Sequence, residues 1–208
     1  MINSTEKILA DKKGVTIVEM LLGIVIMLLI LAAVYVIYNN LISNSGILSS
    51  NLQVQYDVRQ VFNGLSDELR SASLSSTGAY TFATATTNTV IFFSDIDGDG
   101  LKEQVHYFLN GRTLSKGVIK PSGNPLVYVA SNEKFTDIVH DIINASTPVF
   151  SYYDSSYDGT NASLTLPINL TAIRLVKIYL VVDSNSKRAP LPIEFTTQVS
   201  IRNLKDNL

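Results

Sequence analysis

The sequence has no cysteine and no tryptophan, and only two histidines among its 208 residues. Without cysteine the chain forms no disulfide framework, no thiolate zinc site and no iron–sulfur cluster, and it has no cysteine nucleophile. His106 and His140 are too few for a histidine-rich metal site and give little material for a Ser-His-Asp centre. No G-x-S-x-G, phosphate-loop or Rossmann motif is present. We therefore expect a protein that is not an enzyme and requires no cofactor.

Charged side chains are also scarce, at 16% of the residues, and 16 basic against 18 acidic groups leave a net charge of -2. This balance excludes the basic stripe with which nucleic-acid-binding proteins neutralise phosphates, so we expect no direct nucleic-acid binding. The few charges are unevenly spread, because none occurs between Glu19 and Asp57. That uncharged interval is the main signal in the sequence.

Residues 20–38 form an uninterrupted apolar run, MLLGIVIMLLILAAVYVIY. A helix of about 19 residues rises roughly 28 Å, which is enough to cross the hydrocarbon core of a membrane. A buried core helix of this length without a charge is unusual in a chain of this size. A secretory signal peptide has a shorter apolar region that ends in a small-x-small cleavage site, whereas this run ends in Tyr35-Val36-Ile37-Tyr38. We therefore predict one membrane-spanning helix.

Basic residues flank the apolar run on one side only. Lys7, Lys12 and Lys13 precede it, and the next basic residue is Arg59. By the positive-inside rule the N-terminus faces the cytoplasm and the C-terminal part lies outside it. The expected localisation is therefore the cytoplasmic membrane, crossed once, with an extracytoplasmic head.

The residues before the run carry a more specific pattern. Lys12-Lys13-Gly14 is followed by VTIVEMLL, residues 15–22, and then by the apolar run. A short basic leader, a glycine and a Thr-hydrophobic-hydrophobic-Glu run ahead of an apolar helix resemble the class III signal of type IV pilins and type II secretion pseudopilins. The resemblance implies that residues 1–14 are a leader, which a prepilin peptidase removes by cutting between Gly14 and Val15 before it methylates the new amine of Val15. Major pilins usually carry phenylalanine where this chain has Val15, and minor pilins and pseudopilins tolerate other hydrophobic residues there.

Glu19 places a carboxylate at the edge of the apolar run. A charge inside a membrane helix costs about 2.5–3.5 kcal/mol on insertion scales, so such a residue calls for a partner or a function. The resemblance implies that Glu19, the fifth residue of the mature chain, pairs with the N-terminal amine of a neighbouring subunit when helices bundle into a filament. Pairing offsets the cost of both charges and fixes the axial register. The alternative is that Glu19 is only an interfacial residue, favourably placed near a helix N-terminus.

A helical pattern continues beyond the apolar run. Apolar residues recur mostly three or four positions apart with charged residues between them, which predicts one buried stripe and one solvated face. The apolar positions are Leu48, Leu52, Val54, Val58, Val61, Phe62, Leu65 and Leu69. Weak helix formers also indicate a bend or a melted turn. They are Asn39, Asn40, Ser43, Asn44, Ser45 and Gly46. We expect one long helix over residues 15–73, whose second half packs on a globular head.

From residue 74 onward β-forming residues alternate with turn residues, which predicts a β-rich head over residues 74–208. The expected strands are residues 80–83, 89–93, 103–109, 113–115, 126–130, 149–153, 172–182 and 193–202. Asn110-Gly111 is a strong hairpin turn between two of them. Residues 184–192 indicate an exposed loop, and residues 135–143 fit a short helix or an irregular strand equally well. The predicted fold class is therefore α+β, a long N-terminal helix packed on an antiparallel β-sheet head.

One acidic segment of the head has the pattern of a metal site. Residues 95–103 read DIDGDGLKE, and alternating carboxylates followed by glycine match the first half of a calcium loop. A full EF-hand loop would end in a glutamate where this chain has His106. A shorter calcium loop remains feasible. Its ligands would be Asp95, Asp97, Asp99, Glu103 and the carbonyl of Leu101. The alternative is a solvated acidic turn, because Asp and Gly are favoured turn residues in any case.

These features are similar to those of a minor pilin or a J-type pseudopilin, because the chain lacks the cysteine pair and the helix-bending proline of a typical major pilin. This resemblance implies a structural subunit of a type IV pilus-like filament, or of a type II secretion or competence pseudopilus. Its partners would be the prepilin peptidase, other pilin or pseudopilin subunits, and the inner-membrane assembly platform. The alternative is a single-pass membrane protein that displays its β-domain, with or without calcium, as an adhesion or ligand-binding module. A membrane-anchored hydrolase has only the acidic loop in its favour.

Overall fold

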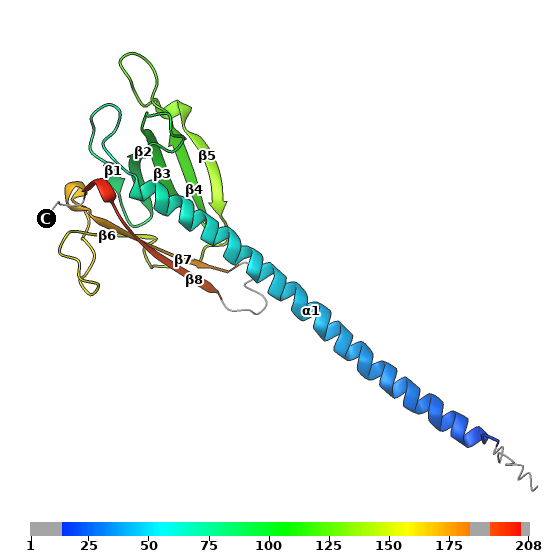
Figure 1. The fold of residues 1–208 in the computed structure, drawn as a ribbon. Helices are drawn as coiled ribbons and strands as arrows, with labels where there is room; N and C mark the ends of the chain where they lie inside the picture. Colours follow the sequence, from blue (N-terminus) through cyan, green and yellow to red (C-terminus); the bar gives the residue numbers. More distant parts are fainter. Residues whose placement is uncertain (1–13, 184–191, 205–208) are drawn as a thin grey trace, which may run out of the picture. The chain divides into compact units, whose positions relative to one another are not determined.

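The structure, a computed structural model, describes residues 14–183 and 192–204. The chain divides into two compact units, Met1–Ser49 and Ser50–Leu208. Helix α1 (Ile17–Arg70) starts in the first unit and ends in the second, and antiparallel β-strands follow it (Figure 1). The fold class is therefore α+β, as the sequence predicts.

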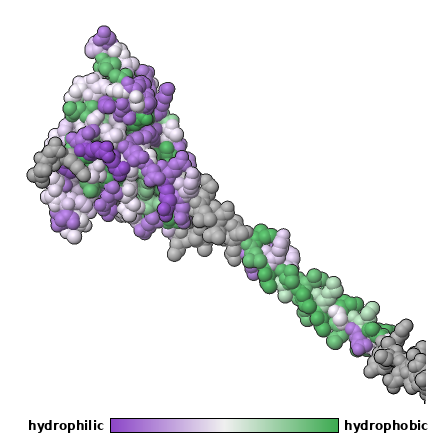
Figure 2. Space-filling model, viewed as in Figure 1, coloured by the Kyte–Doolittle hydropathy of each residue, from purple (hydrophilic) through white to green (hydrophobic). Residues whose placement is uncertain are grey.

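The helix in the first unit is apolar on all its sides. Ile17–Ile42 is long and apolar enough to cross a membrane, and none of it is buried. Figure 2 shows a largely hydrophobic surface along this stretch. A helix that is apolar all round is stable where lipid or other protein covers it. The segment includes the predicted span at residues 20–38 and has the character of a membrane anchor or of a signal sequence.

Helix α1 continues through residues 39–46, so the melted turn expected there is absent from the described helix. Asn, Ser and Gly lower helix propensity by at most about 1 kcal/mol each. Ending the helix and starting a second one would cost a new nucleation step. The helical segments on both sides therefore override the local propensity.

The second unit contains two antiparallel sheets, with strand orders β1-β2-β3-β4-β5 and β6-β7-β8. The strands of the first sheet are β1 (Phe82–Ala85), β2 (Thr89–Ser94), β3 (Glu103–Asn110), β4 (Thr113–Ile119) and β5 (Lys134–Val139). Those of the second are β6 (Phe150–Tyr153), β7 (Leu175–Val182) and β8 (Ile193–Ser200). Consecutive strands are neighbours in both sheets, so each sheet is a meander. Gly111, with a φ of 60°, lies in the predicted hairpin turn, across which Asn110 pairs with Thr113.

Seven of these strands lie close to their predicted positions, but the strand predicted at residues 126–130 was wrong. Val127 forms only an isolated bridge with Ser122, and a 3-10 turn (Ala130–Asn132) follows. Val127 and Val129 are both exposed, so these β-forming residues have no core to face. The stretch also follows Pro125, which has no backbone N–H for a ladder bond.

Residues 135–143, which fitted a helix or a strand, contain most of β5. This strand is at the edge of the first sheet, and only its last residue, Val139, is buried. Strand alternation appears in a sequence when one face of the strand is buried. β5 has no buried face over most of its length, which explains why the periodicity of the sequence did not distinguish a strand from a helix here. Residues 184–191 of the expected loop lie outside the described residues.

The helical stripe predicted for the second half of α1 is confirmed where the structure describes it. Val58, Phe62, Leu65 and Leu69 are buried, three or four residues apart. The ring of Phe62 meets the ring of Phe195 on β8 edge-on, with 6.0 Å between the centroids. Leu48, Leu52 and Val54 have side chains outside the described set. The end of α1 is thus part of the core of the head.

A polar cluster ties the same helix to the first sheet. The hydroxyl of Tyr107 on β3 donates a hydrogen bond of 2.8 Å to Glu68 Oε2, and Lys116 Nζ on β4 lies 2.5 Å from Glu68 Oε1. The side chains of Glu68 and Lys116 are each 19% exposed. Burial, followed by the nearby Glu68 carboxylate, raises the pKa of Tyr107, so the phenol stays protonated and remains a donor. One carboxylate of α1 therefore holds two neighbouring strands.

We expect Glu68→Ala to lower the free energy of unfolding of the head by about 1–3 kcal/mol, because it leaves the hydroxyl of the buried Tyr107 and the half-buried Lys116 ammonium without their acceptor. Denaturant unfolding of the full-length protein in detergent micelles, followed by tyrosine fluorescence, measures this change.

The matched control is Asp67→Ala. Asp67 is the preceding residue of α1, and its only described ion pair is the exposed one with Arg70. Its loss should cost no more than about 0.5 kcal/mol. Equal effects of the two substitutions would show that the Glu68 cluster does not fasten the helix.

Candidate functional site

The start of helix α1 is a hydrogen-bonded cap made by Thr16 and Glu19. The Thr16 N–H and hydroxyl donate to Glu19 Oε2 at 2.9 and 3.1 Å, and the Glu19 N–H donates to Thr16 Oγ1 at 3.2 Å. This reciprocal pair is a capping box, in which the N-cap residue and the third helical residue satisfy each other's backbone N–H groups. Thr16 therefore fixes where the helix begins and how the Glu19 side chain is turned.

Gly14 and Val15, the two residues of the predicted cleavage site, lie just before this cap. Their backbone is not helical, and both are exposed. The capping box does not involve either residue, so a cut between them would leave the start of the helix intact. Exposed, non-helical backbone next to a stable helix end is the kind of segment that a peptidase reaches most easily.

Glu19 has hydrogen-bonding capacity beyond the cap. All its described side-chain hydrogen bonds use Oε2, and among the described residues no partner is recorded for Oε1. A carboxylate near a helix N-terminus also interacts favourably with the helix dipole. The cap therefore supports the interfacial interpretation of Glu19 and leaves one oxygen available to a second donor.

Thr16 was not among the predicted site residues. The signal was present, because T-x-x-E ahead of an apolar run is the sequence pattern of a capping box. Glu19 was interpreted as a charge in an apolar segment, and its role as a local hydrogen-bond acceptor was not predicted. Glu19 can serve both as the acceptor of the helix cap and as a charge in the apolar segment.

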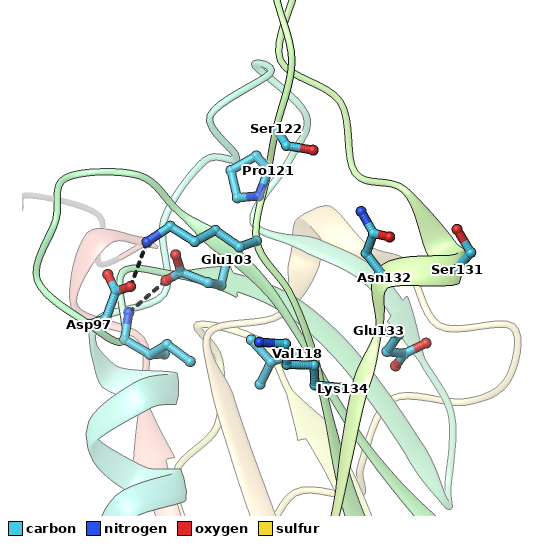
Figure 3. Close-up of a pocket in the computed structure, with 11 residues that line it drawn as sticks. Asp97, Glu103, Val118, Pro121, Ser122, Ser131, Asn132, Glu133 and Lys134 are labelled. Atoms are coloured by element: carbon cyan, nitrogen blue, oxygen red, sulfur yellow. Dashed lines mark hydrogen bonds and ion pairs between the residues drawn. The ribbon is translucent and has the colours of Figure 1, made fainter.

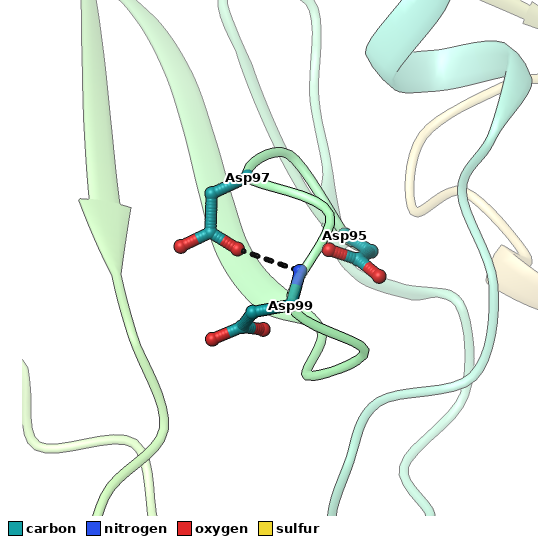
Figure 4. A group of neighbouring side chains, drawn as sticks. All are labelled: Asp95, Asp97 and Asp99. Carbon is teal, nitrogen blue, oxygen red and sulfur yellow. Dashed lines mark hydrogen bonds between the residues drawn. The ribbon is translucent and has the colours of Figure 1, made fainter.

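The second candidate site is the connection between β2 and β3, where three aspartates converge (Figure 4). Asp95, Asp97 and Asp99 each offer one carboxylate oxygen, and these oxygens lie within 4.8 Å of one another. Gly98 and Gly100 have φ values of 76° and 91°, a region in which only glycine is unstrained. The glycines therefore allow the tight turn that brings the carboxylates together.

Backbone N–H groups inside the loop hold the aspartates in place. Gly98 and Gly100 donate to the two oxygens of Asp95 at 2.8 and 3.0 Å. The Asp99 N–H donates to Asp97 Oδ1 at 3.2 Å, and the Leu101 N–H donates to Asp99 Oδ1 at 2.8 Å. Leu101 thus takes part in the loop through its amide.

Two lysines form ion pairs with the three aspartates of this loop. Lys120 Nζ lies 2.7 Å from Asp97 Oδ2 and also contacts Asp99 Oδ2, and Lys102 Nζ lies 3.4 Å from Asp95 Oδ2. The hydrogen bond from Lys120 is the largest influence that lowers the pKa of Asp99 below its ordinary 3.8. Desolvation acts on Asp95 in the opposite sense, but hydrogen bonds from Gly98 and Lys102 still lower its pKa. Asp95 and Asp99 are therefore charged at neutral pH, and each of the three aspartates contacts a lysine ammonium group.

Glu103, the fourth predicted carboxylate ligand, is not in the three-aspartate cluster. It is the first residue of β3 and is only 2% exposed. Its Oε2 accepts a hydrogen bond of 3.0 Å from the Ile96 N–H. Alternation along β3 explains its position, because Glu103 shares the inward face of the strand with Val105 and Tyr107.

The loop is compatible with a divalent cation but would need further oxygens to bind one tightly. Calcium takes six to eight oxygen ligands, and the described side chains supply three carboxylates at this point. A cation would also have to displace the ammonium of Lys120 from Asp97 and Asp99. Calcium binding here stays a prediction from the sequence.

The two histidines have local partners. His106 Nδ1 lies 2.9 Å from Glu133 Oε1, and His140 Nδ1 lies 3.3 Å from Thr113 Oγ1. The only group of three or more metal-ligating side chains in the described residues is that of the three aspartates, so neither histidine belongs to one.

Comparison of the sequence with known protein families gave no matching family model, and comparison with curated proteins gave no matching relative. The resemblance to pilins therefore depends on the residues around Gly14 and Glu19, and on an architecture of an apolar N-terminal helix followed by an antiparallel β domain.

We expect Lys120→Met to strengthen calcium binding to the loop by at least about tenfold, because the ammonium and the cation compete for the same oxygens of Asp97 and Asp99. Titration calorimetry of the full-length protein in micelles, with CaCl2 as titrant, measures the change. Lys177→Met, which removes a lysine of β7 in the other sheet, is the matched control. Absence of calcium binding to both wild type and Lys120→Met would identify the loop as a solvated acidic turn.

Proposed function

We propose that the protein is a non-enzymatic filament subunit, a minor pilin or pseudopilin, that is made as a membrane-inserted precursor. The observation that carries the proposal is the start of α1. A capped glutamate opens a helix that is apolar on every side, directly after a Lys-Lys-Gly sequence. The Lys-Lys-Gly sequence, the capped glutamate and the apolar helix each have another explanation when taken alone. Their order along the chain, however, is the order found in a prepilin.

Processing would convert the precursor into an assembly-competent subunit. The prepilin peptidase would cut between Gly14 and Val15 on the cytoplasmic side and methylate the amine of Val15. The exposed, non-helical backbone at these residues suits such a cut. Cleavage removes the basic residues of the leader, including Lys12 and Lys13, and leaves a helix whose first charged side chain is Glu19.

Assembly would move the apolar helix from lipid to protein. None of Ile17–Ile42 is buried by the part of the chain that the structure describes, so its surface needs either lipid or neighbouring helices. In a bundle of such helices, Glu19 would pair with the Val15 amine of a neighbour, and the oxygen left by the cap would accept that contact. The inner-membrane assembly platform and the other pilin or pseudopilin subunits are the partners that this step implies.

A second candidate function is that of a single-pass membrane protein that displays the head as an adhesion or ligand-binding module. The observation in its favour is that the buried hydrophobic core lies in the second unit, among residues 58–201. A head with its own core can serve at a membrane surface without a filament. The assembly behaviour of Glu19 variants separates the two functions.

We expect Glu19→Gln and Glu19→Ala to leave membrane insertion intact and to lower incorporation into the filament or pseudopilus fraction by at least about tenfold, equivalent to roughly 1.4 kcal/mol. Glutamine preserves the capping box, which accepts either residue at this position, but it removes the charge. Immunoblots of membrane and sheared filament fractions from the native host measure the ratio.

Thr16→Ala is the complementary variant, because it removes the cap hydroxyl and keeps the Glu19 charge. We expect it to assemble better than Glu19→Gln. Glu19→Gln that assembles as well as wild type would mean that Glu19 serves only as a cap, and would remove the charge-pairing role from the proposal.

A further inference from the structure

The head contains a pocket of about 710 Å³ on its five-stranded sheet (Figure 3). Its walls come from the β2–β3 loop, the start of β3, the end of β4, and the segment around η1 (Ala130–Asn132) and the start of β5. Pockets that bind small organic molecules commonly have volumes of roughly 300–1,000 Å³. The segments that form the pocket are separated in the sequence, so no sequence motif predicted it.

Glu103 is one of the residues that line this pocket, and one of its carboxylate oxygens has no described partner. Its Oε2 is engaged by the Ile96 N–H, whereas Oε1 is buried and makes no hydrogen bond to any residue that the structure describes. Buried polar atoms in native proteins are nearly always hydrogen-bonded, and an unpaired buried carboxylate is especially unfavourable. In Figure 3 the carboxylates of Glu103 and Asp97 lie on one side of the pocket, and Ser131 and Asn132 lie on the other.

The other acidic groups of the pocket already have counterparts. Asp97 is paired with Lys120 at 2.7 Å, and Glu133 lies 2.9 Å from His106. Glu133 reaches His106 across Gly117 of β4, where an added Cβ would fall 2.0 Å from Glu133 Oε1. Glycine at this position thus makes room for the Glu133 side chain. Glu103 remains the one acidic lining residue whose buried oxygen lacks a counterpart within the described chain.

The charges of the lining residues and the number of converging oxygens indicate which kind of ligand would fit. The lining has the three carboxylates of Asp97, Glu103 and Glu133 against the two ammonium groups of Lys120 and Lys134, so the surplus is negative and an anion is disfavoured. A divalent metal ion requires several converging oxygens. Glu103 belongs to no group of three metal-ligating side chains in the described residues. A hydrogen-bond donor with a single positive charge would satisfy the one unpaired oxygen, Glu103 Oε1.

The rest of the lining suits an organic body attached to that donor. Ile96, Val118 and Pro121 supply apolar surface, and Ser122 and Asn132 supply hydrogen-bonding groups. Apolar walls with a few polar groups are typical of sites that bind small organic ligands.

We propose that this pocket binds an organic ligand through a primary ammonium or guanidinium group, which donates to Glu103 Oε1. A charge-assisted hydrogen bond of this kind is stronger than a neutral one and supplies the missing partner. The group can come from a free molecule, such as a diamine or a basic amino acid, or from a lysine or arginine side chain of another protein. The proposal does not depend on the role of Glu19.

Titration calorimetry of the full-length protein in detergent micelles tests the proposal with four probes. These are 1,5-diaminopentane, L-arginine, the neutral analogue 1,5-pentanediol, and the blocked peptide acetyl-Gly-Lys-Gly-amide. We expect saturable binding of at least one of the three cationic probes and none of the diol. Binding of the free amines alone identifies a small-molecule ligand, and binding of the peptide alone identifies a protein side chain.

Glu103→Gln should weaken binding by at least about tenfold, because it removes the charge and keeps the shape of the side chain. The matched control is Glu194→Gln, which changes a glutamate of β8 in the other sheet and should leave binding unchanged. Binding that survives Glu103→Gln would place the ligand elsewhere and overturn the proposal.

A measurement on the wild-type protein covers the case in which Glu103→Gln does not fold. The Ile96 amide is bonded to the Glu103 carboxylate, so in protein labelled with 15N-isoleucine its resonance should shift saturably with the bound amine. The Ile178 amide, on β7 in the other sheet, should not shift. No shift of Ile96 with any cationic probe, or a shift with CaCl2 only, would overturn the proposal.

Discussion

No residue that the structure describes buries the apolar surface of Ile17–Ile42, and the other features of the protein depend on that constraint. None of the segment is buried, although apolar surface in water costs roughly 25 cal/mol per Å². A helix satisfies its own backbone hydrogen bonds, so lipid accepts it. The cap at its start matters for the same reason, because the first N–H groups of a helix have no partners inside the helix.

The same helix has a different role in the second unit. There Val58, Phe62, Leu65 and Leu69 form a single buried stripe, and Glu68, on the adjacent face, holds β3 and β4. The first part of α1 is apolar and unburied, whereas the end of α1 is part of the core of the head. One helix therefore belongs both to the membrane-compatible unit and to the folded head.

The features set by local chemistry were predictable from the sequence. The uncharged interval after Glu19 gave the apolar helix, the three-to-four spacing gave the buried stripe, and Asn110-Gly111 gave the hairpin. The secondary-structure predictions failed or stayed open where tertiary packing determines whether a segment forms a strand. Residues 126–130 have strand composition but no core to face, and β5 has too little burial to show alternation. β propensity is a property of the residue itself, whereas the presence of a core surface against which the residue can pack depends on the whole fold.

The candidate sites show the same division. The glycine-containing turn of residues 95–102 brings Asp95, Asp97 and Asp99 together as the sequence suggested. Glu103 was expected among them because it is close in sequence, but strand alternation turns it into the head, where it lines a pocket. The inward position of Glu103 could have been predicted from its spacing to Val105 and Tyr107. The pocket itself could not, because it needs segments that only the sheet brings together.

We propose that the chain is a processed filament subunit, and the N-terminus of the native protein distinguishes this function from that of a displayed β domain. Mass spectrometry of the N-terminal peptide should be carried out on cells with and without prepilin peptidase. We expect a mature chain that begins with N-methylated Val15, and we expect this form only in cells that contain the peptidase. An N-terminus at Met1 in both strains, or a cut after the apolar run, would contradict it and would leave a displayed or secreted β domain.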